Sequence, residues 1–323
     1  MDILKLKETM TQEQLADHLG VSRAKVCHLL RKAKKSERIE YEDRREYTEE
    51  DVDKYIEAMR TMQKAYRKLD NKQVRATVRV NENKPFGVAY WGDWHDGNMG
   101  TDYDKLDEDT EKIKSTDGLY FIGAGDYKDN YISDAPKGGQ FEQIIQPGMQ
   151  DLSVERRMEA VAEKALALIR GCHEDWDKKS GDRDFIEHLC QLTNSINLWH
   201  GGELVIKAGS QEYLWRCRHR YKYQSSLNKP NAMRRIMEIQ GPCDVAAEAH
   251  LHDPFVYDGH VMGEYRVLLR SGSYKLFDEY GQKLAGYKGK WGVPVIIMFP
   301  NEKRIIPFRD LDDGIRVLNS LRK

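Results

Sequence analysis

Several features that would assign this 323-residue chain to a specialised class are absent from it. Its 52 Lys and Arg residues nearly balance its 53 Asp and Glu residues, so the net charge of -1 gives no overall attraction to nucleic acid or membranes. Five cysteines form an odd set without a Cys-x-x-Cys pair, which favours a reducing compartment over a disulfide framework. The longest apolar run, residues 293–299, is strand-sized and far shorter than a membrane span.

The N-terminus also lacks an apolar stretch followed by a small-residue cleavage site, so we expect no secretory signal peptide. These absences predict a cytoplasmic protein that does not contact membranes. What the chain does have is 40% hydrophobic and 33% charged residues, enough to bury a sizeable core, and a length that suits two domains.

The two expected domains differ in their sequence pattern. Residues 1–80 carry apolar residues at helical spacing, whereas residues 84–323 alternate between strand-like and helix-like segments. A polar stretch that ends in proline, residues 81–85, predicts the boundary between them. The pattern therefore predicts a small, mostly α domain followed by an α/β domain.

The first domain contains a helix-turn-helix pattern from about Thr11 to Ala33. Thr11 and Gln14 predict a capping box, Gly20 suits the turn, and Ser22 suits the start of a second helix. The second helix is strongly basic, which suits contact with DNA phosphates, although such charge can also simply solvate a helix face. The residues expected to contact DNA are Ser22, Arg23, Lys25, Arg31 and Lys32.

Residues 38–47 suit a short hairpin, or wing, and a second capping box at Thr48 and Asp51 predicts a long helix to about Leu69. This arrangement resembles the winged-helix variant of MerR-type regulators and excisionases. The resemblance implies a winged DNA-binding domain.

Five short motifs in the second domain carry metal-binding side chains. They are residues 92–95 (Gly-Asp-Trp-His), 125–126 (Gly-Asp), 171–174 (Gly-Cys-His-Glu), 218–220 (Arg-His-Arg) and 249–252 (Ala-His-Leu-His). Apolar runs predict strands at residues 86–91, 119–123 and 244–249, each leading into a motif, whereas Ser153 is expected to cap an amphipathic helix to about Arg170 that leads into residues 171–174. Most motifs thus follow a predicted strand, and the carboxyl ends of strands bring distant residues together in layered α/β folds. With His173 set aside, two aspartates and four imidazoles supply what a pair of divalent metals needs, which predicts hydrolysis of a phosphoester.

In this order the motifs resemble the D-x-H, G-D, G-N-H-E/D, H and G-H-x-H signature of calcineurin-like metallophosphoesterases, over about residues 86–308. The resemblance implies a four-layer α/β/β/α sandwich and two divalent metal ions, with Mn expected and Fe or Zn as alternatives. The preceding helix-turn-helix and residues 270–275 (Arg-Ser-Gly-Ser-Tyr-Lys) make the chain most similar to phage-encoded members, which would act in the host cytoplasm.

The resemblance also assigns roles to individual residues. The implied metal ligands are Asp93, His95, Asp126, Cys172, His219, His250 and His252. Asp126 would bridge the two ions, with Asp93, His95 and His252 on the first. His173 would protonate or steady the leaving oxygen, oriented by Glu174 or Asp175. Asn130 and Arg218 are further candidates to support the metal ligands or to contact the substrate.

Two residues depart from the family signature. Cys172 stands where the family has the asparagine of the second metal, and a thiolate there would favour Zn over Mn. Alternatively Cys172 does not bind metal, and the second ion binds weakly or takes an extra water; a weakened or altered second site is the expectation. Ala249 replaces a glycine and should crowd the backbone only slightly.

Three functions are compatible with these motifs. The leading hypothesis is a metal-dependent nuclease or DNA phosphodiesterase brought to DNA by the first domain. The second is a phosphomonoesterase that acts on nucleotides or phosphoproteins and is only localised by that domain. The third is a non-enzymatic DNA-binding regulator. The motifs do not separate the first two, and a homodimer is compatible with all three.

Overall fold

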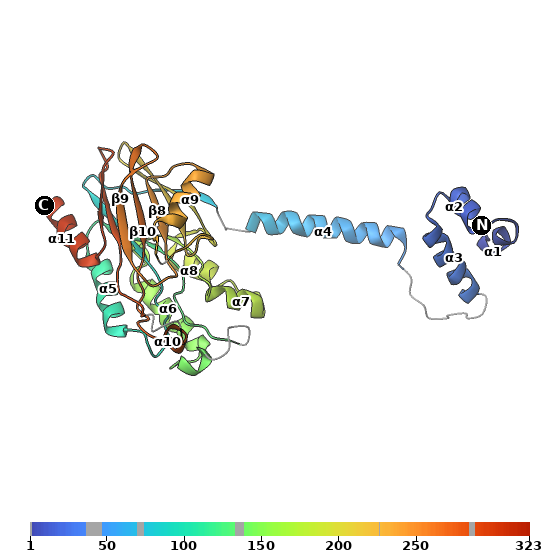
Figure 1. Cartoon of the computed structure of the whole chain (residues 1–323), viewed down its shortest axis with the longest axis horizontal. Coiled ribbons are helices and arrows are strands. Elements are labelled where there is room, and N and C mark those ends of the chain that lie inside the picture. The colour runs from blue at the N-terminus through green and yellow to red at the C-terminus, as the bar shows by residue number, and fades with distance from the viewer. Residues whose placement is uncertain (1, 37–46, 70–73, 133–138, 226, 284–287) are drawn as a thin grey trace. The chain divides into compact units, whose positions relative to one another are not determined.

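The chain divides into two compact units, Met1–Leu69 and Asp70–Lys323 (Figure 1). The computed structural model describes residues 2–36, 47–69, 74–132, 139–225, 227–283 and 288–323. The division precedes the boundary expected at residues 81–85, because strand β1 (Arg75–Arg79) pairs in parallel with β6 (Gly201–Ala208) of the second unit.

The first unit contains helices α1 (Ile3–Thr9), α2 (Gln12–Leu19) and α3 (Arg23–Ser36), which share a small apolar core. That core is formed by Leu15, Ala16, Val26 and Leu30. The predicted capping box of Thr11 and Gln14 is present, and Gly20 adopts φ 63°, the left-handed conformation that ends α2. Apart from Tyr47, the expected wing lies outside the described residues.

Helix α4 (Glu49–Leu69) begins at the second predicted capping box. The backbone N–H of Thr48 donates to Asp51 Oδ2 at 2.9 Å, and the N–H of Asp51 donates to Thr48 Oγ1 at 3.1 Å. These reciprocal bonds satisfy two N–H groups that a helix start otherwise leaves without partners.

Two six-stranded sheets form the centre of the second unit. In order, the first contains β12 (Ile305–Phe308), β11 (Val295–Met298), β2 (Phe86–Trp91), β3 (Leu119–Gly123), β4 (Ala165–Leu168) and β5 (Ile196–Asn197). The second contains β1, β6, β7 (Gln211–Arg218), β8 (Val245–Glu248), β10 (Glu264–Arg270) and β9 (Phe255–Val261). Both sheets mix parallel and antiparallel pairs, with β2, β3, β4 and β5 parallel in one and β7, β8 and β10 parallel in the other.

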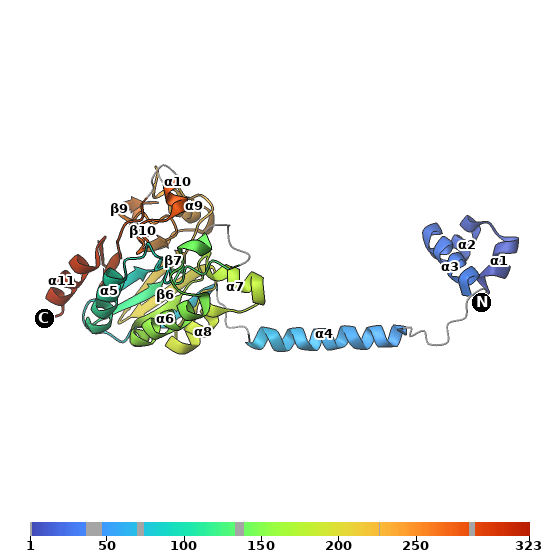
Figure 2. The ribbon, with the colours of Figure 1, turned by 90° about the horizontal axis from the view of Figure 1, so that it is seen from below.

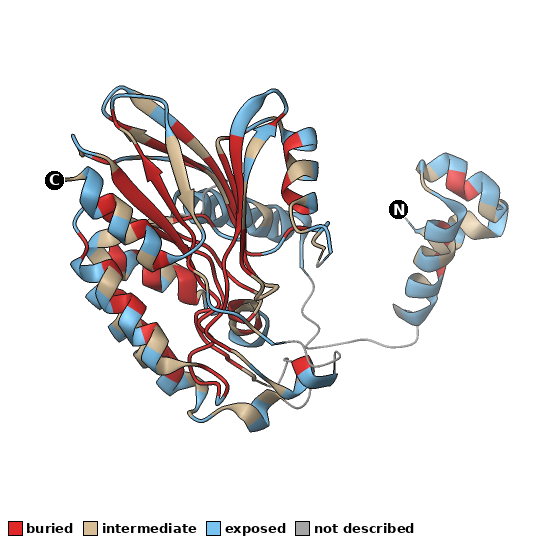
Figure 3. Ribbon diagram, turned by 60° about the vertical axis from the view of Figure 1, so that its left-hand side comes forward, coloured by how far each residue is buried: buried red, intermediate tan, exposed pale blue. Residues whose placement is uncertain are grey.

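Side chains alternate between the two faces of each strand and define the layers. On β2, Val88 and Tyr90 lie in the core between the sheets, whereas Ala89 and Trp91 pack outward against helices. The outer helices of the first sheet are α5 (Tyr103–Ser115), α6 (Pro147–Ala160), α8 (Phe185–Thr193) and α11 (Leu311–Leu321). Helix α9 (Asn231–Gln240) covers the second sheet, which confirms the expected α/β/β/α layers (Figures 2 and 3).

One predicted element is wrong. We expected a helix from Ser153 to about Arg170, but α6 ends at Ala160, and a 3-10 turn (Ala162–Lys164) leads into strand β4. β4 pairs in parallel with β3, so pairing within the buried sheet overrides the helical preference of its Ala and Leu residues. The Gly-Cys-His-Glu motif therefore follows a strand, as most of the other motifs do. Among the described residues, no helix combines the length and apolar composition needed to cross a bilayer.

Candidate metal centre

The five motifs meet at one edge of the two sheets because each follows the carboxyl end of a strand. β2 leads to Asp93, β3 to Asp126, β4 to Cys172, β7 to His219 and β8 to His250. Parallel pairing places the ends of β2, β3 and β4 side by side, and likewise those of β7 and β8. Residues from both sets line one cavity of about 610 Å³.

The backbone at the motif residues is strained. Five of them have φ between 50° and 75°: Asp93, His95, Asp126, His250 and His252. Residues other than glycine rarely adopt this left-handed backbone conformation, and each instance costs about 1–3 kcal/mol of folding free energy. Such a concentration at one place indicates that the fold holds these side chains in position for a function rather than for packing.

Asp93, His95 and His252 form the first group of donors, called the Asp93 cluster. His252 Nε2 lies 3.0 Å from His95 Nε2 and 3.5 Å from Asp93 Oδ1. Asp93 Oδ2 accepts a hydrogen bond from the backbone N–H of His250, whereas Asp93 Oδ1 is buried and receives none from the described residues. A buried carboxylate oxygen without a donor suits a cation, because leaving it unpaired is costly.

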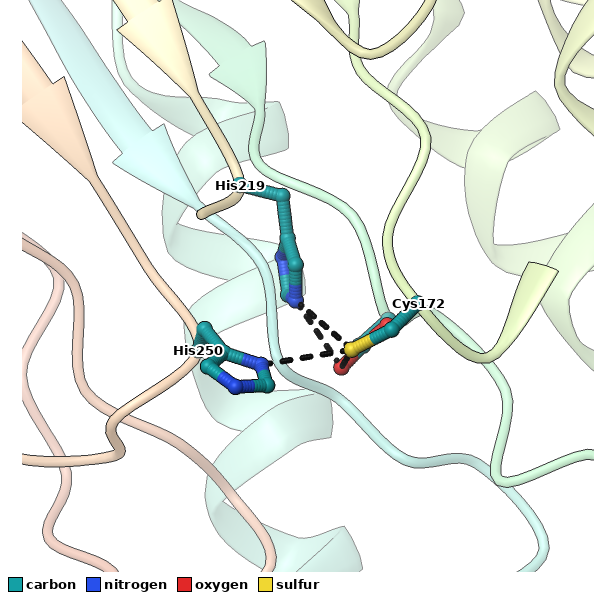
Figure 4. A group of neighbouring side chains, drawn as sticks. Cys172, His219 and His250 are labelled. Carbon is teal, nitrogen blue, oxygen red and sulfur yellow. Dashed lines mark hydrogen bonds and ion pairs between the residues drawn. The ribbon is translucent and has the colours of Figure 1, made fainter. Parts of the chain in front are cut away.

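Asp126, Cys172, His219 and His250 form the second group, called the Cys172 cluster. Cys172 Sγ lies 3.2 Å from His250 Nδ1, 3.4 Å from His219 Nε2 and 3.4 Å from Asp126 Oδ2. Figure 4 shows the labelled side chains pointing toward one another from separate segments of the chain. Cys172 therefore lies within the donor group and not beside it.

Asp126 lies between the two clusters. Its Oδ2 atom is 3.1 Å from His219 Nε2, and the carboxylate also groups with His95 and His173. The other oxygen, Oδ1, accepts the backbone N–H of His173 at 2.9 Å. This position suits a carboxylate shared by two cations.

Two imidazole rings face groups outside the clusters. His219 Nδ1 donates to the carbonyl oxygen of Ala124 at 2.8 Å. His95 Nδ1 lies 3.3 Å from Asp129 Oδ1, close enough for an ion pair but without a hydrogen bond. Partners of this kind fix the ring orientation and leave Nε2 free to face a metal, as around many metal-binding histidines.

His173 is positioned differently from our expectation. Its Nδ1 atom donates to the backbone carbonyl of Asp129, and its Nε2 atom lies 4.0 Å from Asp126 Oδ2. Glu174 instead accepts backbone N–H bonds from Gly171 and Asp126, and Asp175 faces Arg170. The prediction that Glu174 or Asp175 orients the His173 ring is therefore wrong, because neither carboxylate contacts it.

The members of the Cys172 cluster have pKa values shifted in opposite directions. Burial, with a smaller contribution from Asp126, raises the pKa of the Cys172 thiol to about 11, and burial lowers the pKa of His250 to about 3. Although burial opposes both charges, Asp126 raises the pKa of His219 above its usual value, and His219 lowers the pKa of Asp126. Beside the cluster, burial and the charge of Asp126 raise the pKa of Glu174 to about 7. A bound cation would favour the thiolate of Cys172 and the neutral form of His219, the forms that can act as metal ligands.

Asn130 and Arg218, expected to support the site or to contact the substrate, have different positions. Asn130 Nδ2 donates to the backbone carbonyl of His173 at 2.8 Å, so it supports the His173 loop from outside the cavity lining. Arg218 is the last residue of β7 and lines a separate cavity of about 250 Å³. Arg220, two residues further on, lines the cavity of the metal centre.

The structure adds two cations that we did not assign to the site. Lys275 is buried in the cavity wall, with Nζ 2.9 Å from Asp278 Oδ2 and 3.5 Å from Asp129 Oδ1. Although burial opposes its charge, these two carboxylates raise the pKa of Lys275 above its usual value. Arg270 is paired with Glu248, and its Nη1 atom has no partner among the described residues. Both fall in the Arg-Ser-Gly-Ser-Tyr-Lys segment, the one signal that could have identified them.

Three aromatic side chains line the same cavity, and two of them, Tyr131 and Trp176, lie against His173. Tyr131 and Trp176 lie with ring centroids 4.9 Å apart, and Trp176 lies 4.3 Å from the His173 ring. Phe277, which is half exposed, completes the set. The cavity therefore combines metal-binding donors with flat apolar surfaces.

Comparison with known proteins gives only remote likenesses. No family model matches the chain, and no curated protein matches it. Vps29 of Entamoeba histolytica, solved with Zn, is 12% identical with TM-score 0.36 over 69% of this chain and 98% of its own. A predicted phosphoesterase of Streptococcus pneumoniae is 12% identical with TM-score 0.35 over 71% of this chain and 91% of its own. The calcineurin-like phosphoesterase YfkN of Bacillus subtilis is 10% identical with TM-score 0.34 over 75% of this chain and 100% of its own. Likeness this remote establishes neither a family nor an activity.

Proposed function

We propose that this protein is a phosphoester hydrolase that uses two divalent metal ions and acts on DNA. The observation that carries the proposal is the pair of donor clusters, joined at Asp126 and placed beside His173 in one cavity. Strained backbone at five of the donors and the unpaired Asp93 Oδ1 both support occupation by cations.

In this proposal, Asp93, His95 and His252 hold one ion, and Cys172, His219 and His250 hold the other, with Asp126 shared. Imidazole and carboxylate donors suit Mn, Fe or Zn rather than Ca. When bound, such ions polarise phosphoryl oxygens and lower the pKa of water. The remaining steps fall to the side chains of the chain itself.

His173 is the proposed proton donor to the leaving oxygen. Because Nδ1 is held by the carbonyl of Asp129, Nε2 is the ring atom that faces the cavity. An alkoxide leaves poorly unless it receives a proton. Because Nδ1–H is donated to Asp129, Nε2 carries a proton only in the imidazolium form, and transfer of that proton leaves the neutral ring with its hydrogen on Nδ1. Asp129 therefore acts as a positioning residue for both His173 and His95.

Positive groups in the cavity wall support a phosphorylated substrate. Arg220 and Lys275 line the cavity, and Arg270 presents a guanidinium whose Nη1 has no partner among the residues described. Guanidinium and ammonium groups form charge-assisted hydrogen bonds with phosphate oxygens. Asp253 and Asp278 partly offset this charge, so the cavity wall suits contact with one phosphate of a DNA strand at a time.

The aromatic wall supports a nucleotide on the leaving-group side. Tyr131 and Trp176 flank His173, Phe277 lines the same cavity, and flat aromatic rings stack with nucleobases regardless of sequence. A base lying against this wall would place its sugar oxygen near His173. This arrangement favours a phosphodiester of a nucleic acid over a phosphoprotein.

The first unit is the proposed means of reaching DNA. Ser22 Oγ accepts the backbone N–H of Lys25 at 3.3 Å, which supports the first turn of α3. Arg23, Lys25, Arg31 and Lys32 are all exposed on α3, and Arg23 Nη1 lies 3.2 Å from Glu13 Oε1. We propose that these side chains contact the phosphate backbone.

Cys172 is the proposed replacement ligand for the family's asparagine. Its sulfur lies within 3.4 Å of donor atoms from three other cluster members, so it needs no rearrangement to bind the same ion. A thiolate is softer than an amide oxygen, and the second position should therefore prefer Zn over Mn. The geometry favours an altered second site over a weakened one.

The test is digestion of linear, nicked and single-stranded DNA by the full chain loaded with Mn or Zn, beside a chromogenic phosphodiester and phosphomonoester. We expect cleavage of DNA and of the phosphodiester. Turnover of the phosphomonoester without DNA cleavage would instead identify a phosphomonoesterase. DNA binding without hydrolysis of any substrate would identify a regulator.

A matched histidine control separates the site from a contaminating nuclease. His188 is exposed on α8 and pairs with Glu155 outside the cavity, whereas His250 lies in the Cys172 cluster. His250→Asn should abolish cleavage, and His188→Asn, prepared in parallel, should keep the wild-type rate. Equal activity of the two variants would reject the proposed site.

A further inference from the structure

Helix α4 exposes an apolar stripe along its length. Val52, Tyr55, Met59, Met62 and Tyr66 are each between 47% and 70% exposed. They are separated by alternating steps of three and four residues, and Leu69 continues the series by position in the sequence. This spacing is the heptad repeat with apolar residues at its a and d positions, which is typical of helices that pair side by side.

The helix has little within the described structure to stabilise it. None of its described residues is buried, and only Ile56 is half-buried. Surface pairs such as Lys54–Glu50 and Arg60–Glu57 contribute only about 0.2–0.5 kcal/mol each. Most helices gain their stability by burying one face, so an amphipathic helix of 21 residues calls for a partner surface.

The stripe is nearly symmetric about the middle of the helix. Around a midpoint between Arg60 and Thr61, each stripe residue on one side has a counterpart of similar character at the same distance on the other. The counterparts are Met59 and Met62, Tyr55 and Tyr66, and Val52 and Leu69. A surface of this kind is complementary to itself under a two-fold rotation across the helix axis, which is the symmetry of an antiparallel pair.

The charges of α4 favour the same arrangement. Residues 49–57 contain five acidic side chains and one lysine, whereas residues 58–69 contain four basic side chains and no acidic one. An antiparallel pair places the acidic half of each helix beside the basic half of the other, and a parallel pair would place like charges together. Ala58 and Ala65 flank the stripe and allow the two backbones to approach closely.

We infer that α4 pairs with α4 of a second copy of this chain as an antiparallel two-stranded coiled coil. The contact makes the protein a homodimer whose two copies of α3 are joined through α4. A dimeric DNA-binding protein contacts two half-sites, so pairing through α4 would also set the distance between the two half-sites. The inference is independent of the metal centre and of its activity.

The first test is the mass of the full chain in solution, by light scattering or sedimentation at micromolar concentrations. We expect a dimer. Met59→Glu should weaken dimerisation at least about 100-fold, because two methionine side chains lose their contact and two carboxylates enter it. Thr61→Glu is the control, because it adds the same charge two residues from Met59 at a position outside the stripe. This variant should remain dimeric.

An unchanged main thermal transition in Met59→Glu would show that the second unit is still folded. A monomeric wild-type chain would overturn the inference, and so would equal dimerisation of the Met59→Glu and Thr61→Glu variants. Dimers that persist in Met59→Glu would assign the contact to another surface.

The second test determines the direction of pairing. Tyr55→Cys and Tyr66→Cys chains, mixed and oxidised, should form a disulfide between the two variants, because residues 55 and 66 face each other in an antiparallel pair. The Tyr55→Cys chain oxidised alone should form no more disulfide-linked dimer than the wild-type chain does. In an antiparallel pair, the two copies of residue 55 would lie about 16 Å apart along the helix axis, too far for a disulfide. A disulfide between two Tyr55→Cys chains would show a parallel pair and overturn the inference.

Discussion

The Asp93 cluster and the Cys172 cluster lie in one cavity but differ in chemistry. The first contains only carboxylate and imidazole donors, whereas the second adds a thiol. Oxygen and nitrogen donors accept Mn, Fe or Zn, and sulfur shifts preference toward Zn. Two neighbouring positions that share Asp126 should therefore differ in the ion they prefer.

The two clusters also differ in how they are supported. Asp93 accepts the backbone N–H of His250, so a residue of the second cluster supports the first. The Cys172 cluster is supported from outside, because the carbonyl of Ala124 accepts from His219, and the Glu174 carboxylate accepts the N–H groups of Gly171 and Asp126. Ala124 and Glu174, which belong to neither cluster, thus help to determine the geometry of the second.

Asp126→Asn should have the largest effect, because it removes the residue that the clusters share. We expect the rate to fall on the order of 1,000-fold or more, since several kcal/mol of charge stabilisation depend on both ions. Steady-state hydrolysis of a phosphodiester, with metal content measured on the same sample, provides the test. A variant that keeps wild-type activity would contradict a shared aspartate.

His173→Gln separates proton donation from metal binding. Loss of a positioned proton donor should lower kcat about 100- to 10,000-fold while both clusters keep their ions. The loss should be much smaller for a substrate that releases p-nitrophenolate, because this leaving group needs no proton. An equal loss for both leaving groups would show that His173 has another role.

Glu174→Gln should act through Asp126 and weaken the centre by about 10- to 100-fold in metal affinity, as loss of a supporting partner typically does. Both carboxylate oxygens of Glu174 accept backbone N–H groups, whereas a glutamine side chain has only one oxygen that can accept them. Titration with Zn measures the change. Glu187→Gln, at a half-buried position on α8 outside the cavity lining, serves as the control and should leave the affinity unchanged.

Cys172→Asn should have the smallest effect on the rate and the clearest effect on selectivity. It converts the second cluster to oxygen and nitrogen donors, so Zn should bind at least about tenfold less tightly and Mn should support activity better. Competition between the two metals, with Cys27→Ser as a thiol control in the first unit, measures the shift. Unchanged selectivity would show that the sulfur does not bind the ion.

The sequence predicted most of what positions the site. Strands β2, β3 and β8 were recognised from apolar runs followed by ligand residues, and the ends of parallel strands share one edge of a sheet. β4 was mistaken for a helix because Ala165–Leu168 is built from good helix formers. Only its pairing with β3, a contact between distant residues, makes this segment a strand.

The contacts that orient the side chains could not be predicted in the same way. His173 is held by a backbone carbonyl of Asp129, and every residue has a carbonyl, so no residue type marks the interaction. Arg220, and not Arg218, reaches the cavity because β7 ends at Arg218 and strand alternation does not apply beyond it. Such details depend on the loops and leave no periodic pattern in the sequence.

The most direct test of a two-metal centre joined at Asp126 is the number and position of ions in crystals of the Zn-loaded chain, located by anomalous scattering. We expect two ions per chain, one bound by Asp93, His95 and His252 and the other by Cys172, His219 and His250, with Asp126 contacting both. A single ion, or two ions that do not share Asp126, would contradict the account.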